Sequence, residues 1–231
     1  MSHFTVAVFH RPEQSVDEIL APYNEQDEQY MEFEPIDEPS EKLHAEYQQN
    51  ENRYDSFDEF MESYYGCCQN DQGQWGYMSN PNARWDWWQV GGRWSGFLLL
   101  KNGESVDEAV VSDIDFSPDR EEYKAALRWW EVCVEGKPLE DGEDQRDFFN
   151  FYKPEYLIEQ YGSKEKYAES RSEHIPWACL TSDGEWMEKG QMGWFATSDA
   201  TQESRDNFRQ WFMDYIEDHP DLVITMVDCH I

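Results

Sequence analysis

The residues best suited to chemistry lie in a short run rich in tryptophan, glycine and arginine. Four tryptophans fall within ten residues, from Trp85 to Trp94, and a Gly91-Gly92 pair leads into Arg93. Aromatic faces and a guanidinium can hold a base, another ring-bearing ligand or a phosphate by stacking and charged hydrogen bonds. The candidate ligand-binding residues are Asn82, Asp86, Trp87, Arg93 and Trp94.

The same run also has a structural interpretation, which the sequence leaves open. Tryptophans beside a double glycine can form a hydrophobic plug, because glycine lets the backbone turn or approach another group closely. Arg93 would then pair with Asp86 inside the plug. The Gly91-Gly92 pair has the spacing of neither a P-loop nor a dinucleotide-binding glycine motif. The run therefore indicates either a ligand site or a plug.

A second candidate lies at the end of the chain. Alternate residues of a strand point to the same face, so Asp228 and His230 share one face and Cys229 points to the other. A histidine titrates near neutral pH, so this pair could perform acid–base catalysis. No nearby serine or cysteine completes a nucleophilic arrangement. The alternative is that His230 is a hydrogen-bonded structural group.

The sequence gives no sign of a metal site or a cofactor. His174, Cys179, Cys229 and His230 lack the spacing of metal ligands, and no calcium-binding loop motif occurs. The five cysteines are odd in number and irregularly spaced, without a C-x-x-C pair. We therefore expect reduced thiols and an intracellular location.

An acidic segment is the third candidate. Residues 24–59 contain 13 acidic side chains and only two basic ones. Exposed carboxylates can imitate a row of phosphates, which carries one charge per ~1.7 Å of duplex axis. The candidate partner-binding residues are Glu25, Asp27, Glu28, Glu32, Glu34, Asp37, Glu38 and Glu41.

The charge of the whole chain limits its partners. The sequence has 50 acidic and 18 basic side chains, a formal net charge of -32. Phosphates and anionic lipids are bound by lysine and arginine, which argues against direct binding to nucleic acid or to a membrane surface. A basic, nucleic-acid-binding protein is the complementary partner. A negative surface that serves only solubility, or a salt-rich host, is the alternative.

Hydrophobic periodicity and capping residues predict the elements that must position these candidates. Strands are expected at residues 3–9, 105–111, 177–181, 185–187 and 222–231, and Asn102-Gly103 predicts a tight hairpin turn. Helices are expected at residues 15–20 and 56–65, from Ser117-Pro118 to Gly136, at 156–171 with a break at Gly162-Ser163, and at 201–218. Ser56 is the expected cap of the second helix, and the last helix has a buried apolar stripe of Phe208, Trp211, Phe212, Tyr215 and Ile216. Extended chain is expected at residues 190–195, and an extended or loosely helical segment at 24–59.

These elements predict an α+β fold in which a mixed or antiparallel sheet packs with helices around an aromatic-rich core. Aromatic residues make up 16% of the chain, and each buries a large area. We expect one domain over residues 1–231 with an acidic insertion at about 24–59. The N-terminus lacks the features of a signal peptide, and the longest apolar runs, 97–100 and 222–227, are too short to span a membrane.

Several blocks of the chain resemble a family of phage and prophage proteins that has no established activity. The blocks are residues 1–6 with 20–23, Asn80 to Gly96, 183–194 and 227–231. The most specific is the Asn80-to-Gly96 block, and the acidic segment lies outside all of them. The resemblance implies a phage accessory protein that works in bacterial cytoplasm, and it supplies no catalytic residue.

Two functions of different classes follow. The leading hypothesis is a phage protein that antagonises a host defence protein by binding it through an acidic surface that imitates nucleic acid. The alternative is a small-molecule or nucleotide-binding protein or enzyme, in which Arg93 holds an anion and Trp87 or Trp94 stacks. Asp228 and His230 would supply its acid–base chemistry. A virion or assembly component is a third possibility.

Overall fold

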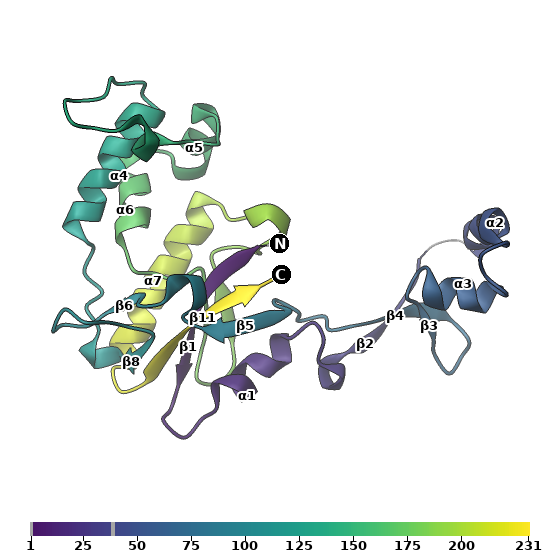
Figure 1. Cartoon of the computed structure of the whole chain (residues 1–231). Helices are drawn as coiled ribbons and strands as arrows, with labels where there is room; N and C mark the ends of the chain where they lie inside the picture. Colours follow the sequence, from purple (N-terminus) through teal and green to yellow (C-terminus); the bar gives the residue numbers. More distant parts are fainter. Residues whose placement is uncertain (1, 38–39) are drawn as a thin grey trace. The chain divides into compact units, whose positions relative to one another are not determined.

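The computed structural model describes residues 2–37 and 40–231 of the protein and confirms the α+β class (Figure 1). The chain divides into two compact units. The larger comprises Met1–Ile19 and Trp88–Ile231, and the smaller comprises Leu20–Trp87. The acidic segment expected at 24–59 lies entirely within the smaller unit.

The larger unit contains a mixed sheet with the strand order β10-β9-β1-β11-β5, and β8 also pairs with β11. Its first and last strands are antiparallel over their whole length, with His3 opposite His230 and His10 opposite Val223. β9 is parallel to β1. The strands are β1 (His3–His10), β5 (Trp87–Val90), β8 (Glu108–Val110), β9 (Ala178–Leu180), β10 (Trp186–Glu188) and β11 (Val223–His230).

Helix α7 (Gln202–Asp218) covers one face of this sheet and contributes to the main core. The predicted apolar stripe is confirmed, because Phe208, Phe212 and Ile216 are buried. The Phe212 ring lies 6.0 Å from that of Phe9 on β1. A capping box begins the helix, since Thr201 and Ser204 each accept from the other's backbone N–H.

Other helices of the larger unit are α1 (Val16–Leu20), α4 (Arg120–Cys133), α5 (Pro154–Tyr161) and α6 (Lys164–Ser172). The predicted break between α5 and α6 is confirmed, and Ser163 caps α6. The predicted start of α4 at Ser117-Pro118 is wrong. Asp119 is the cap, because its carboxylate accepts from two backbone N–H groups of the first turn, at 2.7 and 3.0 Å.

Short turns and hairpins complete the larger unit. The hairpin predicted at Asn102-Gly103 joins β6 (Leu98–Leu99) to β7 (Ser105–Val106). The extended chain predicted at 190–195 is wrong at its end, because Phe195 adopts a φ of 59° inside a 3-10 turn. The 3-10 helices of both units are Ala21–Tyr23, Glu28–Tyr30, Gly92–Trp94, Val111–Asp113, Gln145–Phe148 and Trp194–Ala196.

The smaller unit has a core of its own. A three-stranded antiparallel sheet has the order β2-β4-β3, and two helices pack with it. Its elements are β2 (Glu32–Pro35), α2 (Ser40–Asn50), α3 (Phe57–Ser63), β3 (Cys68–Gln69) and β4 (Trp75–Ser79). The predicted Ser56 cap of α3 is confirmed, whereas α2 is a regular helix where a loose segment was expected. Buried Leu43, Phe60, Met61 and Cys67 form the core.

Within the described ranges, we find no helix that is both long enough and apolar enough to cross a membrane.

Candidate functional site

The aspartate near the end of β11 is the centre of a polar cluster. Asp228 is completely buried. Its Oδ1 lies 2.8 Å from Nδ1 of His3, and its Oδ2 accepts the backbone N–H of Arg93 at 3.1 Å. Asp228 therefore joins the first strand, the last strand and the glycine-rich loop.

His230 also belongs to this cluster. The rings of His3 and His230 meet edge to face, with centroids 4.9 Å apart. Asp228 and His230 lie on one face of β11, as predicted, whereas His3, which is hydrogen-bonded to the carboxylate, carries no such prediction. His3 reaches Asp228 because the first and last strands pair in antiparallel register, and that pairing is the only feature that identifies His3 as part of the cluster. The cluster is a buried carboxylate with two partly exposed imidazoles.

The double glycine is required where the loop meets Asp228. Gly91 and Gly92 have φ values of +66° and +56°, and a Cβ on Gly92 would overlap the Asp228 side chain. A second carboxylate holds the loop from the other side, since Asp107 accepts from the Gly96 N–H at 2.6 Å and from Ser95 Oγ at 3.0 Å. The loop from Gly91 to Gly96 is thus held by two aspartates.

Substitution of Gly92 by alanine tests this arrangement. We expect a loss of more than about 2 kcal/mol in the free energy of unfolding, since positive φ costs roughly 1–2 kcal/mol and the overlap with Asp228 adds to it. Gly136→Ala is the control, because Gly136 has a φ of +73° and a Cβ there meets nothing within 4 Å. Equal losses for the two variants in urea unfolding would contradict the role given to the Asp228 contact.

The five predicted ligand-binding residues divide between the two units. In the larger unit Arg93 is exposed and Trp94 half-buried, and the Arg93 guanidinium forms no ion pair within the described part of that unit. In the smaller unit Asn82 is exposed, Asp86 is half-buried and Trp87 is 47% exposed.

A buried asparagine organises the start of the Asn80-to-Gly96 block within the smaller unit. Asn80 Nδ2 donates to the carbonyl oxygens of Pro22 and Asn24, at 2.9 and 2.8 Å. Its Oδ1 accepts the Asn82 N–H at 2.9 Å. Residues 80–87 of the block lie in the smaller unit and residues 88–96 in the larger one. In each unit the contacts described above hold segments of that same unit together, as the structural interpretation of the block requires.

The predicted acidic residues lie on the surface of the smaller unit. Six are exposed and Asp27 is half-buried, while Glu38 falls outside the described residues. Glu32 and Glu34 alternate on the edge strand β2, so they share a face. None of the seven described carboxylates forms an ion pair with another described residue. The exposed members are Glu25, Glu28, Glu32, Glu34, Asp37 and Glu41.

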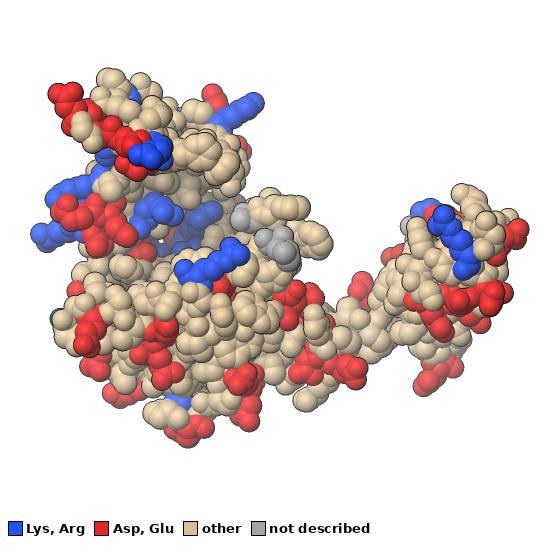
Figure 2. Space-filling model, in the orientation of Figure 1, with Lys and Arg blue, Asp and Glu red and all other residues tan. Residues whose placement is uncertain are grey.

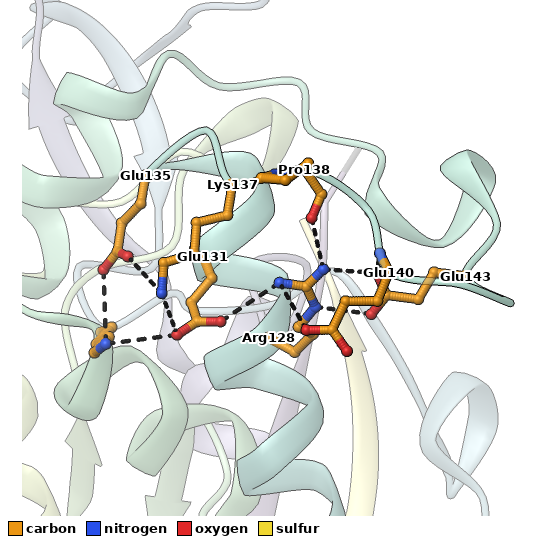
Figure 3. A network of polar contacts seen from close by, with 8 residues as sticks. Arg128, Glu131, Glu135, Lys137, Pro138, Glu140 and Glu143 are labelled. Carbon is orange, nitrogen blue, oxygen red and sulfur yellow. Dashed lines mark hydrogen bonds and ion pairs between the residues drawn. The ribbon is translucent and has the colours of Figure 1, made fainter.

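The carboxylates around α4 in the larger unit are different, because lysine and arginine neutralise them (Figure 3). Arg128 makes two hydrogen bonds of 2.7 Å to the Glu143 carboxylate and one of 2.9 Å to the Pro138 carbonyl. Lys137 donates to Glu131 at 2.7 Å. The hydrogen bonds from Arg128 lower the pKa of Glu143 to about 2. This network fastens the loop after α4 back to the helix.

Acidic side chains lie on both units in the view of Figure 2. The smaller unit has 16 acidic residues and three basic ones. The larger unit also shows acidic groups over much of its visible face, and its basic groups gather beside a hollow. The negative surface is therefore extensive, and the carboxylates on residues 25–41 of the smaller unit are an exposed part of it that a partner could contact.

Comparison of the chain with protein-family models, with curated proteins and with solved structures gave no match.

Proposed function

We propose that the protein binds a basic, nucleic-acid-binding protein through the carboxylates of its smaller unit. The observation that carries the proposal is the set of seven described carboxylates on residues 25–41 that form no ion pair with another described residue. They stand on a compact unit with its own aromatic core. Such a unit can present charge without neutralising it internally.

The physical basis is electrostatic complementarity. Carboxylates that are already solvated and have no ion-pair partner can exchange water for lysine and arginine side chains of another protein. Long-range attraction then accelerates the encounter, and added salt screens it. On the partner the carboxylates would occupy positions that normally hold phosphates, so binding would exclude DNA or RNA from the same groove.

The biological setting forms part of the proposal. The resemblance to phage and prophage proteins supports an accessory protein in bacterial cytoplasm that antagonises a host defence protein. A nuclease or a defence complex has the basic groove that an acidic unit would enter. The occupied groove would leave that enzyme unable to hold its nucleic acid.

The test measures binding to a panel of host nucleases and defence complexes at increasing salt. We expect the affinity to fall steeply with salt and nucleic acid to compete for the partner. A variant that combines four substitutions should bind the partner about tenfold or more weakly. The four substitutions are Glu25→Gln, Glu28→Gln, Glu32→Gln and Glu34→Gln.

A matched variant removes the same number of charges from the larger unit. It changes four exposed glutamates with no described ion pair, namely Glu13→Gln, Glu159→Gln, Glu185→Gln and Glu217→Gln. We expect it to bind almost as well as the unmodified protein. Equal weakening by both variants would show an effect of net charge alone, and affinity independent of salt would reject the proposal.

A further inference from the structure

A pocket of about 210 Å³ lies between α6, α7 and the segments that flank β9 and β10. It contains five of the 18 basic side chains of the chain, although the protein as a whole is strongly acidic. Figure 2 shows lysine and arginine side chains gathered beside a hollow between the helices labelled α6 and α7 in Figure 1. The five are Lys166, Arg171, Lys189, Arg205 and Arg209.

Only some of these positive charges are matched. Lys166 lies 3.4 Å from the Asp206 carboxylate and 3.6 Å from that of Glu169. Arg209 binds Glu173 through Nε at 2.7 Å and Nη2 at 2.6 Å. The pocket thus has three carboxylates for five cations. Arg171, Lys189 and Arg205 form no ion pair with another described residue. The described lining therefore carries two more positive charges than negative ones.

Arg205 is held by rings rather than by hydrogen bonds. Its guanidinium carbon lies 5.4 Å from the Tyr161 ring centroid and 5.5 Å from that of Trp177. Trp177 is itself anchored, since its indole N–H donates to the Gly190 carbonyl at 2.9 Å. The Nε of Arg205 is buried, and no described residue accepts its hydrogen. A desolvated donor of this kind is unfavourable unless a ligand supplies an acceptor.

Two more side chains of the pocket have hydrogen-bonding capacity that a ligand could fill. Lys189 donates to the Ile175 carbonyl at 3.1 Å, which leaves two of its three hydrogens. Gln202 donates from Nε2 to Asp206 at 3.0 Å, but its buried Oε1 receives no hydrogen from any described residue. The pocket therefore combines cationic donors without acceptors and one amide oxygen without a donor.

From these contacts we propose that the pocket binds a small phosphomonoester. Its phosphate accepts from Lys189, Arg205 and Arg171, and a hydroxyl group on its organic part donates to Gln202. A phosphate dianion matches the two uncompensated charges, whereas a carboxylate supplies only one negative charge. The volume of the pocket limits the organic part to a few heavy atoms. This site lies in the larger unit and is independent of the acidic surface.

The experiment compares the melting temperature of the full-length protein with different anions at equal ionic strength. Glycerol phosphate is the phosphomonoester, and inorganic phosphate, sulfate and acetate are the comparisons. We expect glycerol phosphate to raise Tm by about 3 °C or more at millimolar concentration and to exceed inorganic phosphate. Acetate should have almost no effect. Equal shifts with sulfate and glycerol phosphate would reject a phosphomonoester site.

Variants assign the response to the pocket. Arg205→Gln and Lys189→Met should each lower the affinity for glycerol phosphate, measured by calorimetry, by about tenfold or more. Arg146→Gln is the control, because Arg146 is an exposed arginine outside the pocket, paired with Asp144. If Arg205→Gln proves unstable, Lys189→Met alone decides the result. No binding by the unmodified protein, or binding retained in Lys189→Met, would overturn the proposal.

Discussion

Replacement of Lys189 by methionine is expected to raise the free energy of unfolding at pH 7 by roughly 1–3 kcal/mol. Burial and the nearby Arg205 lower the pKa of Lys189 from 10.5 to about 8. Folding therefore places a charged group where its charge is unfavourable. Methionine has a similar length and no charge, and it can pack beside the Phe208 ring, which lies 5.8 Å from the ammonium.

The effect should depend on pH with a definite sign. Between about pH 8 and pH 10.5 the unfolded chain binds more protons than the folded one at this lysine. The stability of the unmodified protein therefore rises through that window, while below it the full penalty remains. The charged or titratable groups around Lys189 are Arg205 from α7, Glu173 after α6 and Cys179 from β9.

Urea unfolding of the two proteins from pH 6 to pH 10.5 measures this difference. The advantage of Lys189→Met should be largest at and below pH 7 and should shrink as the pH rises. Titrations shared by both proteins cancel in the comparison. An advantage that stays constant with pH, or a less stable variant at pH 7, would contradict the charge-burial explanation.

Substitution of Asp228 by alanine should lower the free energy of unfolding by about 2–4 kcal/mol, because two hydrogen bonds lose a buried acceptor and each unsatisfied buried group costs about 1–3 kcal/mol. The His3 ring and the Arg93 backbone N–H would both lose their acceptor. Hydrogen exchange should also show faster exchange of the Arg93 amide. Denaturant unfolding measures the first effect and mass spectrometry or NMR the second.

Asp107→Ala is the matched control for Asp228→Ala. Asp107 holds the same loop through Gly96 and Ser95, but it is only half-buried. We expect it to cost about 1–2 kcal/mol, since partial exposure lets water replace the lost acceptor. A loss for Asp228→Ala no greater than that for Asp107→Ala would show that Asp228 does not hold the loop as described.

Local signals predicted much of the fold. The apolar stripe of α7, the cap at Ser56, the break at Gly162-Ser163 and the Asn102-Gly103 hairpin are confirmed. The start of α4 shows how a local signal can mislead. Ser117-Pro118 has the residue types of a helix start, but Asp119 forms the cap because its carboxylate reaches two first-turn N–H groups.

The contacts at Asp228 were beyond sequence reasoning. His3 and Asp228 are 225 positions apart, and their hydrogen bond exists because the first and last strands pair in one antiparallel register. The role of the double glycine follows from the same event. A Gly-Gly-Arg run indicates backbone freedom, but only the position of Asp228 explains why a Cβ would not fit at Gly92.

The sequence by itself determined the α+β class, the aromatic character of the core, the excess of carboxylates and the main helices and strands. These properties depend on composition or on residues within one or two turns of each other. Only the tertiary structure decided which charges are matched. Arg128 meets Glu143 and Arg209 meets Glu173. Arg171, Lys189 and Arg205 converge from three segments and form no ion pair with any carboxylate that the structure describes. Coulomb energy depends on distance through space, and a count of charges along the chain does not contain that distance.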